Sequence, residues 1–146
     1  MKKLMTAFAI IGAVWGLSVS ARAADTPESY EGITLVDATK AKELKDKGIP
    51  IFDVRVANEY AEEHIAGAIS LPYKEKSKKE INFDVSLDSF DDSKLPAKGM
   101  IFQCNGKECW KSFKASLWAL KKGKKEIYWL RGGIPEWKAK GYPTTH

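Results

Sequence analysis

Apolar segments of strand length alternate with helix-like segments along this chain. The apolar segments are rich in β-branched and aromatic residues, and the segments between them show helical spacing, capping residues or terminal glycines. Such alternation predicts parallel strands joined by right-handed crossovers. We therefore expect an α/β fold with a five-stranded, mostly parallel sheet and helices on both faces. The predicted strands are 33–36, 49–54, 66–71, 100–103 and 126–130.

Helices are predicted between these strands. Asp37 or Thr39 can cap the first helix, and Pro135 has the residue type favoured at the first position of the last one. Between the third and fourth strands, residues 73–98 are highly charged and without clear periodicity, so we expect an irregular crossover with one helical turn near 87–90. The predicted helices are 37–48, 58–64, 110–123 and 135–141.

The helix after residue 110 has the clearest pattern. Apolar residues recur there at helical spacing, and lysines occupy another face, as expected of an amphipathic helix. Trp110 lies on the apolar stripe, which favours packing in the core over contact with a substrate. Trp118 falls on the lysine face. The apolar positions are Trp110, Phe113, Leu117 and Leu120, and the lysines are Lys111, Lys114 and Lys121.

The first residues have the pattern of a secretory signal peptide. Two lysines precede an apolar stretch that ends near Val19, and Ala21-Arg22-Ala23 is a small-x-small cleavage site. The stretch is short for a membrane span, which needs about 20 residues. The protein is therefore expected in the bacterial periplasm or outside the cell. The expected organisation is a signal peptide over 1–23, a flexible lead-in over 24–32 and one domain over 33–146.

Charge and composition exclude other classes of function. The formal charge of +5 falls to near +2 when the three basic residues of the signal peptide are removed. The remaining lysines are interleaved with acids, so no basic stripe for nucleic acid is present. After cleavage we expect no membrane association either. Two cysteines and one internal histidine are too few for a structural zinc site, so we expect neither a metal nor a cofactor.

Cys104 is the strongest candidate for chemistry. It directly follows a predicted strand and precedes a short loop that leads into the helix at Trp110. Ligands bind at the carboxyl ends of parallel strands, and successive loop amides can hold an anion such as a thiolate. Lys107 and Lys111 add positive charge that can attract an anionic substrate, while Glu108 opposes them. The expected anion-binding loop is Asn105, Gly106, Lys107, Glu108, Cys109 and Lys111.

Two sets of residues resemble the rhodanese-like sulfurtransferases. They cover nearly the whole chain that remains after the predicted cleavage, and two ordered sets at plausible spacing make the resemblance specific. The first set is Phe52-Asp53-Val54-Arg55, Glu59-Tyr60, His64-Ile65-Ala66-Gly67-Ala68-Ile69 and Pro72. The second set is Cys104, Ser112, Ala115, Leu117, Gly123, Ile127, Leu130-x-Gly132-Gly133, Trp137, Gly141 and Pro143.

The resemblance implies an activity. Cys104 matches the cysteine that carries a transferable sulfur as a persulfide, with thiosulfate as a typical donor and a thiophile or a partner thiol protein as acceptor. The resemblance gives Asp53, Arg55 and His64 as structural motif residues. An ion pair that fixes the adjacent loop, and a hydrogen-bonded histidine, are favoured there over catalytic roles.

The active-site loop departs from the family pattern. Seven residues stand between Cys104 and Ser112, where the family commonly has five between the cysteine and a Ser or Thr, so the loop is expected to be longer by two. Glu63 stands where the family usually has glycine. The pair Cys109-Trp110 is similar to that of a minor periplasmic subgroup with a Cys-x(n)-Cys-Trp loop.

Three interpretations of the two cysteines remain open at this point. In the first, Cys104 is the nucleophile of a sulfurtransferase, and Cys109 can resolve a persulfide by thiol attack. In the second, the pair has a thiol–disulfide redox role, or forms the disulfide that an oxidising compartment favours. In the third, the domain keeps the rhodanese fold as a catalytically silent binding domain.

Overall fold

The structure, a computed structural model, describes residues 24–146. The predicted signal peptide lies outside the described residues. No helix in the described part of the chain is both long and apolar enough to span a bilayer.

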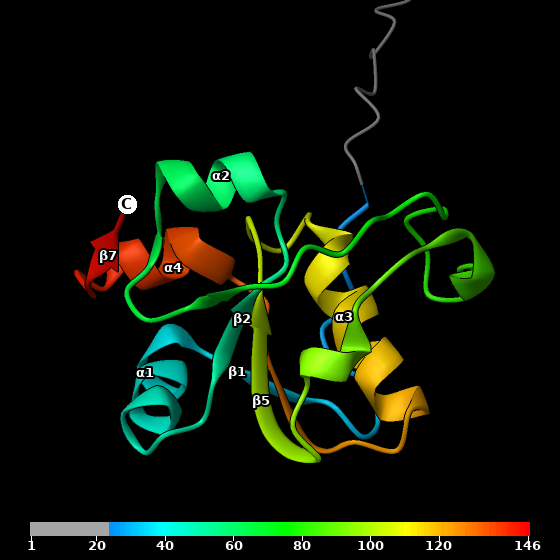
Figure 1. Ribbon diagram of the computed structural model, residues 1–146, viewed down its shortest axis with the longest axis horizontal. Coiled ribbons are helices and arrows are strands. Elements are labelled where there is room, and N and C mark those ends of the chain that lie inside the picture. Colours follow the sequence, from blue (N-terminus) through cyan, green and yellow to red (C-terminus); the bar gives the residue numbers. More distant parts are fainter. Residues whose placement is uncertain (1–23) are drawn as a thin grey trace, which may run out of the picture.

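A five-stranded sheet forms the centre of the molecule. Its strands run in the order β1-β6-β5-β2-β4, and every pairing between neighbours is parallel, which confirms the predicted fold class. Because the strands are parallel, their carboxyl ends meet at one edge, at the top in Figure 1. The strands are β1 (Thr34–Val36), β2 (Ile51–Asp53), β4 (Ile69–Ser70), β5 (Lys98–Gln103) and β6 (Lys125–Leu130).

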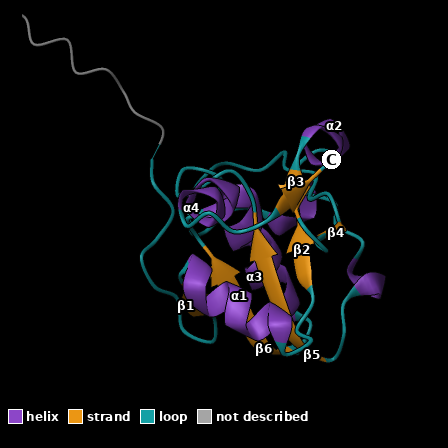
Figure 2. Ribbon diagram, turned by 90° about the vertical axis from the view of Figure 1, so that its left-hand side faces the viewer, coloured by secondary structure: helices purple, strands orange, loops and turns teal. Residues whose placement is uncertain are grey.

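Helices cover both faces of this sheet. α1 (Ala38–Asp46) and α4 (Gly133–Ala139) lie on one face, and α3 (Trp110–Lys121) lies on the other, as the two perpendicular views agree (Figures 1 and 2). The short helix α2 (Ala57–Glu62) lies beyond the carboxyl edge. Both faces of the central strands are therefore buried, as their continuous apolar sequences require.

Two apolar cores result from alternation along the strands. Phe102 of β5 faces α3 with Phe52 and Trp129, its register partners on β2 and β6. The neighbouring Ile101 faces the opposite way, into the core beneath α1 and α4. Side chains of β5 are buried on both sides of the sheet, and only Lys98 at its start is exposed. Cys104, the next residue, emerges from it on the α3 side.

Some element boundaries differ from the predictions. Asp37, rather than Thr39, caps α1, and its carboxylate accepts the backbone N–H of Lys40 at 2.7 Å. α4 begins at Gly133, two residues before Pro135. The predicted strand 66–71 is wrong in its extent, since only Ile69–Ser70 joins the sheet. The preceding β3 (His64–Ile65) instead pairs antiparallel with β7 (Thr144–Thr145), close to the carboxyl terminus.

The crossover 73–98 is irregular, as predicted, and it contains an ordered polar centre. Asp88 accepts hydrogen bonds from the Tyr73 hydroxyl, the backbone N–H groups of Lys76 and Ser77, and the Ser77 hydroxyl. Burial acts to raise the pKa of Asp88, but these hydrogen bonds outweigh it and hold the pKa below its ordinary value. The helical turns are η1 (Val85–Leu87) and η2 (Asp92–Lys94), on either side of the expected position.

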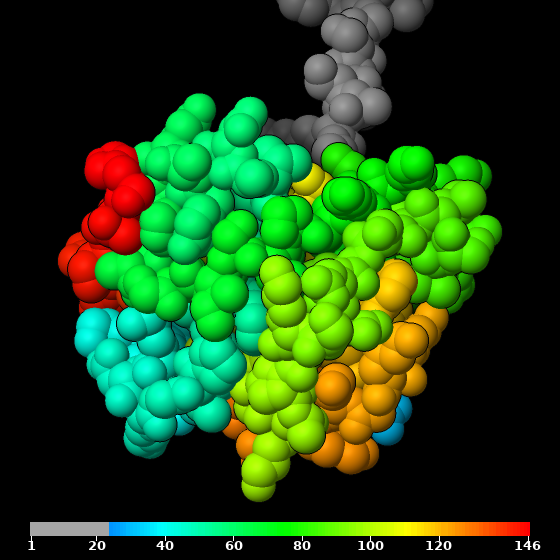
Figure 3. Space-filling model, in the orientation of Figure 1, coloured from blue at the N-terminus to red at the C-terminus, as the bar shows by residue number. Residues whose placement is uncertain are grey.

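Lys114 fastens the crossover to α3. The amphipathic pattern predicts an exposed lysine face, but Lys114 is fully buried, so that prediction is wrong for this residue. Its ammonium lies 2.7 Å from the Glu75 carboxylate and donates to the Ser77 hydroxyl and the Lys78 carbonyl. Trp118, on the same face, is half-buried and packs edge-on against Tyr73. This face of α3 is therefore covered by the crossover and does not face solvent (Figure 3).

Candidate functional site

Cys104 lies where the sequence places it, directly after the carboxyl end of β5. It is disulfide-bonded to Cys109, and the Cα atoms of the two residues are 6.3 Å apart. The loop between them turns back sharply, because the Cys109 N–H donates to the Gly106 carbonyl at 3.0 Å. Cys104 is 1% exposed, whereas Cys109 is half-buried. Cys109 is therefore the more exposed residue of the pair.

The loop is not lengthened, which corrects the expectation from the sequence. α3 begins at Trp110 with Cys109 as its N-cap, so five residues separate Cys104 from the helix. The two additional residues before Ser112 form the start of the helix instead of extending the loop. Ser112 consequently points back from the first helical turn toward the cysteine.

A buried hydroxyl contacts the Cys104 sulfur. Ser112 Oγ lies 3.2 Å from Cys104 Sγ, and Ser112 is fully buried. The same oxygen accepts the indole N–H of Trp129 at 2.9 Å. A disulfide sulfur carries no hydrogen, so the Ser112 hydroxyl is the donor in its contact with Cys104. The Trp129 indole thus orients the Ser112 hydroxyl, which donates one hydrogen bond to the Cys104 sulfur.

The expected ring of loop amides is not formed in the disulfide state. Within residues 24–146, no backbone N–H donates to Cys104 Sγ, and its second polar contact is the Cys109 carbonyl at 3.4 Å. The Cys104 carbonyl accepts the Ile134 N–H at 3.0 Å, so the cysteine backbone is tied to α4. A role for the amides of residues 105–109 stays a prediction for the reduced loop. The importance of Ser112 and Trp129 together could not be found from sequence, since it depends on a contact between α3 and β6.

The charged residues of the loop point to other partners. Lys107 lies 3.3 Å from the Asp25 carboxylate, and the amide of Asn105 donates to Glu59 of α2 at 2.7 Å. Glu108 is exposed and Lys111 is half-exposed. Lysine charge therefore surrounds the loop without a direct contact to the sulfur.

The segment 24–26, which we call the strap, lies across the cysteine loop. Thr26 is 2% exposed, and both its N–H and its hydroxyl donate to the Lys107 carbonyl, at 2.8 and 2.6 Å. Arg131 donates to the Thr26 carbonyl at 2.7 Å, and the indole of Trp110 donates to the Ala24 carbonyl at 2.9 Å. The residues expected to begin a flexible lead-in are thus fastened to the site.

Gly133 fixes the loop from the other side. A Cβ atom at this position would lie 2.1 Å from the Cys104 carbonyl oxygen and 2.7 Å from the Gly106 nitrogen. Its φ of +60° also lies in the left-handed region that favours glycine. The start of α4 can therefore approach the loop backbone only without a side chain.

A groove of about 550 Å³ lies beside the loop, where β1 and β6 end. Lys107 and Arg131 supply positive charge in its wall, and Asp37, Glu108 and Glu136 supply carboxylates. Burial raises the pKa of Glu136 above its ordinary value. Neither cysteine lines this groove.

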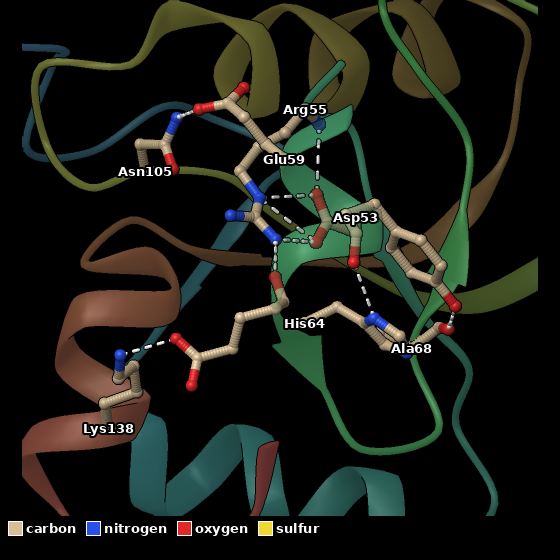
Figure 4. Close-up of polar contacts among 9 residues, drawn as sticks. Asp53, Arg55, Glu59, His64, Ala68, Asn105 and Lys138 are labelled. Carbon is tan, nitrogen blue, oxygen red and sulfur yellow. Dashed lines mark hydrogen bonds and ion pairs between the residues drawn. The ribbon is translucent and has the colours of Figure 1, made fainter. Parts of the chain in front are cut away.

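The residues Asp53, Arg55 and His64 form a separate bracket, shown in Figure 4. Arg55 donates hydrogen bonds from Nε and Nη2 to the fully buried Asp53 carboxylate, and Nη2 also donates to the Glu63 carbonyl at 2.6 Å. Burial disfavours the charge on Arg55, but the hydrogen bond to Asp53 and the negative charges of Asp53, Glu59 and Glu63 together outweigh burial and raise the pKa of Arg55. His64 contacts the Tyr60 carbonyl through Nδ1 at 2.7 Å. None of the three contacts the cysteine pair through a hydrogen bond.

No metal centre accompanies either group of residues. Across residues 24–146 there is no cluster of three or more His, Cys, Asp or Glu residues that could hold a metal ion. The absence of a cofactor stays a prediction.

The comparisons with known proteins agree with this architecture. A model of the rhodanese-like domain family matches residues 37–140. The chain belongs to the family of rhodanese-like domains. No curated protein matches it.

Solved structures show the same fold at low sequence identity. The rhodanese-like domain of Alr3790 from Anabaena is 26% identical, with a TM-score of 0.55 over 80% of each chain. The BH2092 protein from Bacillus halodurans is 24% identical, with a TM-score of 0.56 over 77% of this chain and 76% of that one. Thiosulfate sulfurtransferase from Pseudomonas aeruginosa is 22% identical, with a TM-score of 0.54. The match covers 78% of this chain but only 20% of the sulfurtransferase chain.

Proposed function

We propose that this protein is an exported sulfurtransferase of the rhodanese type, which moves a sulfane sulfur through a persulfide on Cys104. The observation that carries the proposal is the position of Cys104, at the carboxyl end of the central strand and in contact with the Ser112 hydroxyl. A matching fold in a thiosulfate sulfurtransferase adds support.

The magnitudes favour Ser112 as the main stabiliser of the thiolate. A free cysteine has a pKa of about 8.5, so little thiolate is present at pH 7. A helix N-terminus contributes about 0.3–1 kcal/mol, which lowers a pKa by less than one unit. A hydrogen bond to a charged group contributes about 1.5–3 kcal/mol, or about one to two units. The buried donor therefore matters more than the dipole of α3.

The first half of the reaction consumes an anionic sulfur donor such as thiosulfate. The Cys104 thiolate attacks the outer sulfur of the donor, the sulfur–sulfur bond of thiosulfate breaks, and sulfite leaves with the bonding electron pair. Cys104 then carries a persulfide. Lys107 and Lys111 supply the positive potential that brings the donor to the loop.

The second half transfers the outer sulfur to a thiophilic acceptor, which can be a small molecule or a partner thiol protein. A nucleophile on the acceptor attacks that sulfur and releases the Cys104 thiolate. Only the dithiol form can begin this cycle, so the Cys104–Cys109 disulfide is a resting state that must be reduced first.

Thiocyanate formation from thiosulfate and cyanide tests the proposal. Reduced protein comprising residues 24–146 should form thiocyanate, and Cys104→Ser should form none. Cys109→Ser is the matched control, because it cannot form the disulfide and should be active without prior reduction. Activity that survives in Cys104→Ser would refute the proposal, and an inactive but folded wild-type protein would favour a silent binding domain.

Export is part of the same proposal and has its own test. The signal-peptide pattern of residues 1–23 supports a periplasmic or secreted protein, as does the similarity of the Cys109-Trp110 loop to the periplasmic subgroup. Protein purified from a periplasmic extract should begin at Ala24. A chain that retains Met1 in the cytoplasmic fraction would contradict export.

The disulfide itself favours a second candidate function, a thiol–disulfide redox role. Redox-active pairs have potentials between about −270 and −120 mV, whereas structural disulfides lie below about −300 mV. Equilibration with glutathione or dithiothreitol buffers measures the potential of Cys104–Cys109. A value in the upper range supports a redox-active pair, and a value below it identifies a structural disulfide.

A further inference from the structure

We infer that Cys109 discharges the Cys104 persulfide as hydrosulfide, so that the protein converts a sulfane sulfur into sulfide at the expense of an external dithiol. The inference rests on the proposed function, because it needs the persulfide. In this inference, Cys109 is the nucleophile that attacks the persulfide, sulfide is the product, and a dithiol is the class of partner.

The two sulfur atoms are held within reach of each other. The pair is bonded in the structure, the Cα atoms are 6.3 Å apart, and ordinary disulfides span about 4.4–6.8 Å between Cα atoms. The turn at Gly106 brings Cys109 back over Cys104 without any rearrangement of a strand or helix. When Cys104 carries a persulfide, the Cys109 thiol is therefore an intramolecular nucleophile, and such nucleophiles act at very high effective concentration.

The burial of the pair favours Cys109 over an external thiol at the inner sulfur. Cys104 is 1% exposed, and Cys109, which is bonded to it, is half-buried. A thiol from solution meets the outer sulfur of the persulfide first, whereas Cys109 Sγ is within bonding distance of Cys104 Sγ. Attack by Cys109 on that inner sulfur produces the same bond that is present in the structure.

The step balances as follows. The Cys109 thiolate forms a bond to Cys104 Sγ, the bond between Cys104 Sγ and the outer sulfur breaks, and the outer sulfur leaves as hydrosulfide with the electron pair. The sulfane sulfur is reduced to sulfide, and the two cysteines are oxidised to the disulfide. A dithiol reductant, in solution or on a partner protein, then reduces Cys104–Cys109 and becomes a disulfide itself. The net reaction converts thiosulfate and a dithiol into sulfite, sulfide and the oxidised dithiol.

The environment of the pair determines which of the two sulfur atoms the reductant attacks. The reductant meets Cys109 first, because Cys109 is the more exposed residue of the pair and stands beside the exposed Lys107 and Glu108. Attack there expels the Cys104 thiolate, to which Ser112 donates its hydrogen bond. A stabilised thiolate is the better leaving group. Attack of the reductant on the more accessible Cys109 therefore also regenerates the Cys104 thiolate, which is the nucleophile of the next cycle.

A single-turnover experiment tests the inference. Protein of residues 24–146 is reduced, freed of reductant without oxygen, and mixed with one equivalent of thiosulfate. Sulfite, sulfide and the intact mass after acid quench are then measured. The wild type should release one sulfite and one sulfide per chain and end two hydrogen atoms lighter than the reduced protein. Cys109→Ser should release sulfite, retain the mass of one added sulfur, and release less than about a tenth of the sulfide.

The outcomes separate this inference from the proposed function. A wild type that keeps the added sulfur and releases no sulfide would overturn the inference and leave the sulfurtransferase intact, as would an added sulfur that maps to Cys109. The absence of sulfite from both proteins would overturn the two together. Circular dichroism of the reduced variants confirms that each is folded before the comparison is made.

Discussion

The bracket around Asp53 and the loop that starts at Cys104 stand at the same edge of the sheet, but they are stabilised differently. In the bracket, Arg55 binds Asp53 two residues away and the Glu63 carbonyl eight residues away. In the loop, the partners of Lys107 and Ser112 come from Asp25, Thr26 and Trp129, far away in the sequence or on another element. The contacts of Arg55 are local in the sequence, whereas the contacts of the reactive loop depend on the assembled fold.

The largest expected effect is on the bracket. Asp53→Asn leaves the Arg55 charge buried without its counterion, which costs about 3–5 kcal/mol of unfolding free energy. Denaturant unfolding measures this loss. Lys138→Met, which removes the exposed partner of Glu63, is the control and should cost about 1 kcal/mol or less. Equal losses in the two variants would show that the bracket is not the stronger support.

Gly133→Ala should have the next largest effect, and it acts on the loop. The new Cβ would collide with the Cys104 carbonyl and the Gly106 nitrogen, both backbone atoms that cannot rotate away. We expect a loss of about 3 kcal/mol or a displaced loop with reduced thiocyanate formation. Gly141→Ala has a similar positive φ but no atom within 4 Å, so it isolates the backbone strain, about 1–2 kcal/mol. Equal effects of the two substitutions would exclude the close approach as the cause.

Ser112→Ala should change reactivity more than stability. In a Cys109→Ser background, loss of the donor should raise the pKa of the Cys104 thiol by about one to two units. The pH dependence of iodoacetamide alkylation measures this pKa, and the alkylation rate at neutral pH should fall. Ser116→Ala is the matched control, because Ser116 is buried on the same helix but donates to the Ser112 carbonyl. An unchanged pKa in Ser112→Ala would remove Ser112 from the mechanism.

The smallest effect is expected at the strap. Thr26→Val removes the hydroxyl that donates to the Lys107 carbonyl and accepts from Arg131, at a cost of about 1 kcal/mol. Hydrogen exchange should become faster in residues 105–109 and stay unchanged around Asp53. Thr39→Val, at an exposed position, should alter neither region. If the loop amides of Thr26→Val exchange at the wild-type rate, the strap does not stabilise the loop.

The fold could be predicted from the sequence because it follows from local patterns. Strand and helix periodicity fixed the parallel sheet and placed Cys104 at its carboxyl edge, and the Asp53–Arg55 pair followed from a short motif. The burial of Lys114 could not be predicted, because a lysine on a helix is buried only when distant groups such as Glu75 and Ser77 neutralise and hydrogen-bond it.

The candidate site was predicted in its residues but not in its contacts. The spacing from Cys104 to Ser112 suggested a longer loop, yet the extra residues belong to α3, and this depends on where the helix starts. The strap at Thr26 and the Trp129–Ser112 hydrogen bond join segments that no periodicity relates. Long-range contacts of this kind determine which groups surround the sulfur.

The identity of the atom that carries the sulfur is the central claim, and peptide mapping tests it most directly. Reduced Cys109→Ser protein is treated with thiosulfate, alkylated and digested, and the peptide that contains Cys104 is examined by mass spectrometry. The account predicts one additional sulfur atom on Cys104, with an equivalent amount of sulfite in solution. A Cys104 peptide of unmodified mass, in a protein that is folded and reduced, would contradict it.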